Sequence, residues 1–170
     1  SELGVDVRSR SVNDLRGVAL DDAESVSGVD YGLHFIMQRL DDILNPLSGS
    51  RFNVALRYGE KQFSTSRPEL VPRSNEDQWT VHADLVQFIP LAERSTIKMR
   101  AQVHHTESEV VLANEQERIG GLKTLRGQDE QAVRVSSYSI GTAEYRLLTG
   151  PRSYISGFFD GGWIRSDVIT

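Results

Sequence analysis

Polar and apolar side chains alternate at every position of the stretch Thr96-Ile97-Lys98-Met99-Arg100-Ala101-Gln102-Val103-His104. Successive side chains of a β-strand point to opposite faces of its sheet. In a helix, by contrast, side chains two residues apart fall on opposite sides, so the apolar set would be split. The stretch therefore predicts a strand whose odd positions form an apolar face and whose even positions form a polar face.

The same alternation recurs along the chain and predicts seven strands. One begins at Leu3, and the others cover Gly28–Gln38, Arg51–Gly59, Gln78–Ile89, Thr96–His104, Ala132–Leu148 and Ser153–Ile164. Several approach the ~9–11 residues that a tilted strand needs to cross a bilayer. The prolines fall between the predicted strands, as expected because proline removes a ladder hydrogen bond. They are Pro46, Pro68, Pro72, Pro90 and Pro151.

The connections between the predicted strands alternate in length. The long ones are Ser11–Ser27, Lys61–Asp77 and His105–Gln131, and the short ones are Asp41–Ser50, Pro90–Arg94 and Thr149–Arg152. Outer-membrane barrels have this pattern because their periplasmic turns are tight and their extracellular loops are long. We therefore expect an antiparallel transmembrane β-barrel with its apolar residues toward lipid. A soluble β-sandwich with one polar face remains the alternative.

In such a barrel the polar positions face a hydrated interior. This set includes the basic residues Arg57, Lys98, Arg100, Arg134 and Arg146. The aromatic residues Tyr31, Tyr58, Trp79, Tyr145 and Trp163 are candidates for the girdles at the two membrane interfaces.

Composition excludes several other functions. The 170-residue chain has no cysteine, which removes disulfides, thiolate metal sites and cysteine nucleophiles. A net charge of −5 argues against nucleic acid as a partner. No run reaches the ~20 apolar residues of a membrane helix. The mean hydropathy of −0.37 still permits a barrel, whose strands place only alternate residues in lipid.

No catalytic motif is present, so we expect neither an enzyme nor a cofactor. The chain lacks a Gly-x-Ser-x-Gly elbow, a His-Glu-x-x-His helix and a Walker-type loop. His82 and His104 lie on neighbouring predicted strands, but two histidines without a third ligand are more often polar lining than a metal site. We expect no metal.

Three segments in the last third of the chain carry the functional signal. The first is Arg118-Ile119-Gly120-Gly121-Leu122-Lys123-Thr124-Leu125-Arg126-Gly127, in the longest connection. The second is Ala143-Glu144-Tyr145-Arg146, and the third is Phe158-Phe159-Asp160-Gly161-Gly162-Trp163, each on its own strand. In order and spacing they resemble the BamA/TamA family of outer-membrane assembly and translocation barrels. Arg39–Gly49 and Val86–Leu91 are similar to earlier elements of that family, whereas Gln128 departs from the aromatic residue that usually follows Arg-Gly.

The residues themselves predict a contact. If Tyr145 and Phe159 face lipid, then Glu144 and Asp160 face the interior from neighbouring strands. Two carboxylates in one cavity repel each other unless a cation accompanies them. We predict that Arg126 supplies this cation with bidentate geometry. The loop glycines Gly120, Gly121 and Gly127 would let the backbone turn tightly toward the wall. The competing interpretation is a solvated loop arginine.

The resemblance implies a function that composition does not. It implies a bacterial outer-membrane protein that inserts or assembles other proteins there. Its expected partners are the lipid bilayer, unfolded outer-membrane clients and accessory lipoproteins. Residues 1–170 would supply strands seven to thirteen of a sixteen-stranded barrel, without the other strands or the periplasmic POTRA domains. Alternatives are a two-partner-type secretion pore of the same family, a passive porin, and the soluble sandwich as a binding module.

Overall fold

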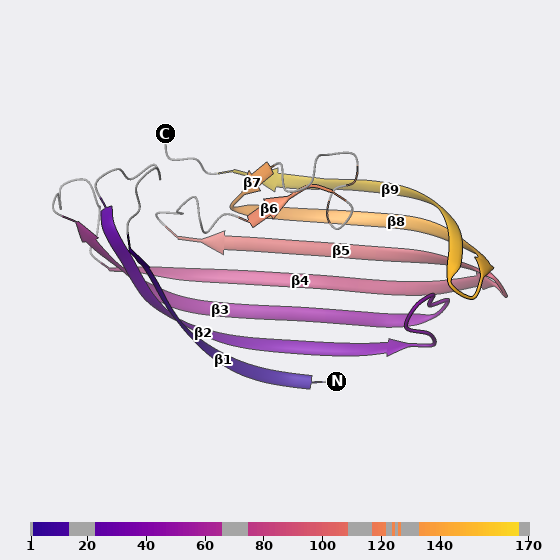
Figure 1. The fold of residues 1–170 in the computed structure, drawn as a ribbon, viewed down its shortest axis with the longest axis horizontal. Coiled ribbons are helices and arrows are strands. Elements are labelled where there is room, and N and C mark those ends of the chain that lie inside the picture. Colours follow the sequence, from indigo (N-terminus) through magenta and orange to yellow (C-terminus); the bar gives the residue numbers. More distant parts are fainter. Residues whose placement is uncertain are drawn as a thin grey trace.

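The computed structural model describes residues 2–13, 23–65, 75–108, 117–121, 124, 126 and 133–166. Seven strands form one antiparallel sheet in the order β1-β2-β3-β4-β5-β8-β9 (Figure 1). A separate pair, β6–β7, lies in the connection between β5 and β8. The strands are β1 (Glu2–Asn13), β2 (Ala23–Leu40), β3 (Gly49–Thr65), β4 (Asn75–Ala92), β5 (Ser95–Glu107), β6 (Glu117–Ile119), β7 (Val133–Val135), β8 (Ser137–Gly150) and β9 (Ser153–Arg165). The predicted all-β antiparallel sheet is confirmed.

The two faces of the sheet have opposite character. Residues directly opposite in register share a face, so Lys98 and Glu144 mark one face, and Met99 and Ala143 mark the other. We call these the polar face and the apolar face. Buried side chains of the polar face include Lys61, Thr96, Gln102, His104, Thr142, Glu144 and Arg146. Exposed side chains of the apolar face include Leu3, Val5, Leu33, Phe35, Leu56, Met99, Tyr145, Leu147, Phe159 and Trp163. A water-soluble sheet shows the reverse arrangement.

Several details of the strand prediction were wrong. Strands β2, β3 and β4 extend further into the predicted long connections than expected. The predicted strand Ala132–Leu148 is broken at Ser136, where β7 ends and β8 begins one residue later. Arg134 consequently lies on β7 and is exposed, so it is not part of the polar face. Pro90 lies inside β4, opposite Thr96, rather than between strands. The register shifts between Pro90 and Ala92, and a missing N–H is tolerated at such an irregularity near a strand end.

The short connections all lie at one end of the sheet. Consecutive strands are antiparallel, so the connections 41–48, 93–94 and 151–152 share an end, which lies on the right in Figure 1. The strand ends that flank the other connections, at Asn13 and Ala23, Thr65 and Asn75, and Glu107 and Ser137, lie at the opposite end. The described part of the chain contains no helix long and apolar enough to span a bilayer.

The connection between β2 and β3 is folded against the neighbouring turns. The Asp41 carboxylate accepts hydrogen bonds from the backbone N–H groups of Asp42, Leu47 and Ser48. Burial opposes ionisation of this carboxyl group, but the backbone donors outweigh it and lower its pKa. The Asn45 amide donates to the Pro151 carbonyl at 2.9 Å. The connection therefore reaches from β2 to the turn between β8 and β9, which fixes the position of the short-turn end.

Candidate functional site

A turn in the long connection brings Arg126 to the polar face. Gly120 and Gly121 have φ values of 123° and 83°, a region that L side chains rarely adopt. The Gly120 N–H donates to the Thr124 hydroxyl at 2.8 Å, and this hydroxyl donates back to the Gly120 carbonyl at 3.0 Å. The turn thus closes on itself just before Arg126.

The Arg126 guanidinium forms a two-point contact with Asp160. Its Nε and Nη2 atoms donate to the two carboxylate oxygens at 2.8 and 2.7 Å. The Thr142 hydroxyl donates to the same carboxylate at 2.8 Å. The Phe158 ring lies under the guanidinium, with Cζ 3.5 Å from the ring centroid. Planar charge pairing and stacking together match the geometry that favours arginine over lysine.

Glu144 collects three cations. It accepts from Arg126 Nη1 at 3.3 Å, from Arg146 Nε at 2.9 Å and from Lys98 Nζ at 3.5 Å. Its side chain is only 3% exposed. A buried carboxylate is tolerated only when it is paired and hydrogen-bonded, and here both of its oxygens have partners. With Asp160, the cluster holds two carboxylates and three basic groups, so the carboxylates are fully compensated. We call these five residues the charge cluster.

The hydrogen bonds that Arg126 donates to Asp160 raise the pKa of the guanidinium above its ordinary value, against the opposing effect of desolvation. The guanidinium therefore stays charged at every physiological pH.

An apolar contact holds the same connection at a second place. Ile119 of β6 and Val135 of β7 pack on Tyr138 and Ile140 of β8 in a buried cluster, with Val133 against it. Ile119 is 1% exposed and Val135 is fully buried. Burying each such side chain contributes ~1.5–3 kcal/mol. The connection is thus attached to the sheet by apolar packing at Ile119 and Val135 and by Arg126 between them.

A second ion network lies beside the charge cluster on the polar face. Arg100 contacts both carboxylate oxygens of Asp84 through Nε and Nη2, at 2.8 and 2.9 Å. Arg51 Nη2 approaches Asp84 at 3.7 Å. Paired charges therefore continue across the polar face from β3 to β9.

His82 and His104, the histidines considered above as metal ligands, lie opposite each other in register on the polar face. Their ring centroids are 6.2 Å apart, and His104 stacks on Tyr138 at 5.7 Å. The described residues contain no group of three metal-ligand side chains.

The structure brings together the predicted residues Arg126, Glu144 and Asp160, and gives Gly120 and Gly121 the turn conformation expected of them. Gly127 and Gln128 lie outside the described residues. Sequence reasoning placed Lys98 and Arg146 on the polar face but missed their contacts with Glu144, and it missed Phe158 as a stacking partner. The pairing of Lys98 with Glu144 follows directly from the strand register.

Comparison with protein-family models and with characterised proteins finds no match to either.

Proposed function

We propose that this chain is part of a transmembrane β-barrel of the BamA/TamA type, which inserts or assembles other proteins in a bacterial outer membrane. The observation that carries the proposal is the long connection that returns to the polar face and places Arg126 between Asp160 and Glu144. A passive pore needs no such arrangement, because a docked connection occupies the space that solutes would cross.

The apolar face supports placement in a membrane. Tyr31, Tyr58 and Trp79 form one row across β2, β3 and β4, with the Tyr58 and Trp79 rings 4.7 Å apart. Arg39, Ser50 and Gln87 form a parallel row eight residues further along each strand. Every apolar-face position between the two rows is apolar: Leu33, Phe35, Met37, Phe52, Val54, Leu56, Val81, Ala83 and Leu85.

The height of this apolar band fits a bilayer. Eight residues span ~27 Å along a strand, or ~20 Å along a membrane normal at the tilt of ~40° usual in barrels. Outer-membrane barrels have an apolar band of ~25 Å bounded by aromatic residues. In a soluble sandwich, exposed side chains such as Leu33 and Leu56 would need a second sheet to cover them.

The docked connection gives the proposal its mechanism. Arg126 links β8 and β9 through Glu144 and Asp160 and so holds this part of the wall in register. A wall that keeps its shape lets another part of the same barrel open an edge without collapse. An open edge presents unpaired backbone groups, which are a template for strand addition by a client protein.

The test uses the full-length protein in its own cell. We expect Arg126→Ala to lower the level of folded client barrels, measured by heat-modifiable gel migration, while the protein itself still reaches the membrane. Arg134→Ala is the matched control, because this exposed arginine lies in the same connection without contacting the charge cluster. Unchanged levels of every client barrel after complete removal of the protein would refute the proposal. Loss of one secreted substrate alone would assign the chain to a secretion pore instead.

Pore conductance provides an independent test against a porin. We expect low conductance for the intact protein and a rise after deletion of Ala113–Gln131. High conductance before the deletion, and no change after it, would favour a passive pore.

A further inference from the structure

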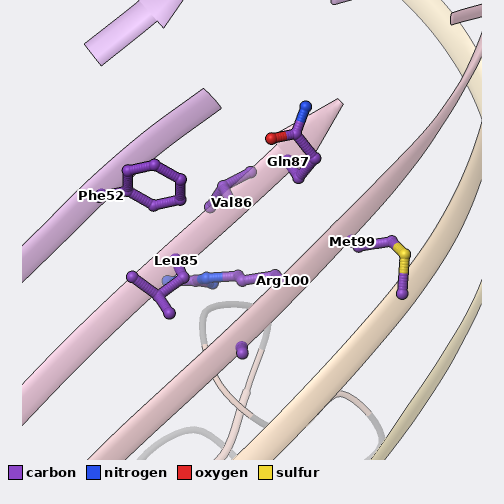
Figure 2. A pocket seen from close by; sticks show the side chains of 7 residues that line it. Phe52, Leu85, Val86, Gln87, Met99 and Arg100 are labelled. Carbon is purple, nitrogen blue, oxygen red and sulfur yellow. The ribbon is translucent and has the colours of Figure 1, made fainter. Parts of the chain in front are cut away.

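The apolar face is hollowed next to the polar row that bounds it. Phe52, Leu85, Gln87, Met99 and Ala101 line a hollow of about 200 Å³. Figure 2 shows that these side chains come from three neighbouring strands, with Phe52 and Leu85 on one flank and Met99 on the other. The hollow exists because the small Ala101 lies opposite Leu85, between larger neighbours.

The walls of the hollow are apolar, but one end is polar. Gln87 lies opposite both Ser50 on β3 and Met99 on β5, and its Nε2 donates to the Phe88 carbonyl at 3.0 Å. Its amide oxygen and second N–H direction remain available to a ligand. Ser50 in turn lies opposite Arg39 on β2.

Arg39 completes the row with a positive charge. It is exposed, and its side chain makes no hydrogen bond or ion pair with the described residues. The nearest acids along the chain, Asp41 and Asp42, accept hydrogen bonds from backbone N–H groups of their own connection, which orients both carboxylates toward that connection. A cation, a hydroxyl and an amide therefore lie in one row beside an apolar hollow.

We propose that this feature binds one phospholipid, with the phosphate at Arg39, Ser50 and Gln87 and an acyl chain in the hollow. Arginine matches a phosphate with bidentate geometry, and a hydroxyl and an amide provide further donors. A volume of 200 Å³ accommodates several methylene groups, each similar in size to a water molecule of ~30 Å³. An anionic headgroup is favoured over a zwitterionic one because Arg39 supplies a guanidinium to pair with its charge.

This inference rests on the proposed membrane placement. The row lies toward the short-turn end of the sheet, which faces the periplasm in outer-membrane barrels. The lipid would therefore belong to the periplasmic leaflet, at the level where phosphate groups meet the hydrocarbon region.

The experiment measures lipid retention on the full-length protein. The purified protein is mixed with bicelles of phosphatidylglycerol or of phosphatidylethanolamine, returned to detergent and analysed by native mass spectrometry. We expect one retained lipid, with phosphatidylglycerol favoured about fivefold, the effect of one basic residue at an anionic surface. Arg39→Gln should abolish the preference, and Ala101→Trp should reduce retention of both lipids by filling the hollow.

Two controls match these substitutions. Arg94→Gln removes an exposed arginine from a turn at the same end, and Val5→Trp adds the same bulk on the apolar face of β1, away from the hollow. Both should behave like the unaltered protein. The lipid site is refuted if Arg39→Gln and Ala101→Trp retain lipid unchanged, or if the controls reduce retention equally.

Membrane extraction and heat-modifiable migration are recorded for every variant. A membrane-inserted barrel without selective lipid retention would overturn this inference alone. A protein that never enters the membrane would overturn the proposed function together with it.

Discussion

Replacing Arg126 with alanine removes the group that joins the long connection to strands β8 and β9 of the sheet. Asp160 loses both of its guanidinium contacts and keeps the Thr142 hydroxyl. Glu144 loses one contact at 3.3 Å but keeps Arg146 and Lys98. The damage is therefore concentrated on Asp160, whose side chain is 4% exposed.

The expected loss follows from burial and partner number. Removing one partner of a buried ion pair costs ~3–5 kcal/mol, because the remaining charge is left uncompensated. The Arg126 side chain is 16% exposed, and water can reach the vacated position, so we expect the lower end of this range, ~3 kcal/mol. The lost stacking on Phe158 is included in this figure.

A double-mutant cycle measures the interaction directly. The free energy of unfolding is determined by urea titration of the full-length protein in lipid vesicles, for Arg126→Ala, Asp160→Asn and the double variant. We expect a coupling energy of ~2 kcal/mol with Asp160 and a smaller one in the parallel cycle with Glu144→Gln, since Glu144 retains two other cations. A coupling energy with Asp160 below ~0.5 kcal/mol, the range of a solvated surface pair, would refute the argument.

Three further predictions concern the connections. Gly121→Ala should destabilise docking of the connection by ~1–2 kcal/mol, because φ is 83° at this position. Gly157→Ala is the control and should have no such effect, because an added Cβ there meets open space. Protection of the connection from protease measures the difference. Ile119→Ala should destabilise docking of the same connection by ~2–5 kcal/mol, because the Ile119 side chain is 1% exposed. Hydrogen exchange in β6 and β7 measures this loss. Folding lowers the pKa of Asp41, so its ionised carboxylate stabilises the connection fully at pH values above ~3.9, the ordinary pKa of aspartate. This stabilisation is lost as the pH falls through the lowered pKa. The Ser48 N–H, which donates to Asp41, should therefore lose its protection from hydrogen exchange only in acid, after correction for the intrinsic pH dependence of exchange.

Side-chain alternation was enough to predict both faces of the sheet. Because side chains alternate with a period of two, placing one residue of a strand fixes the face of all the others. Thr96–His104 lies within β5 with its lysine, arginine and histidine on the polar face as predicted. The contact of Arg126 was predictable for a related reason. Two carboxylates fixed on adjacent strands define where a cation is needed, whatever path the connection takes.

The structure of the long connection could not be predicted in the same way. The strands β6 and β7 have three residues each, which is too short for a period to be recognised. Their pairing depends on Ile119 and Val135 reaching Tyr138 and Ile140, a tertiary contact with no local signal. The position of Pro90 inside β4 likewise depends on a register shift that only the paired strand reveals.

The charge pairs of the polar face bear on how such a sheet could deform. From β3 to β9, Asp84, Glu144 and Asp160 each have a close basic partner. Nearer β1, His34 Nδ1 approaches Asp6 at 3.8 Å, and the buried Nε of Arg57 on β3 has no hydrogen-bond partner among the described atoms. An unmet buried donor costs ~1–3 kcal/mol, so a rearrangement that gave this Nε a partner would gain free energy, whereas one that separated the charge cluster would lose it. Under the proposed function, the docked connection and the charge cluster would therefore preserve β8 and β9 while another part of the sheet deforms.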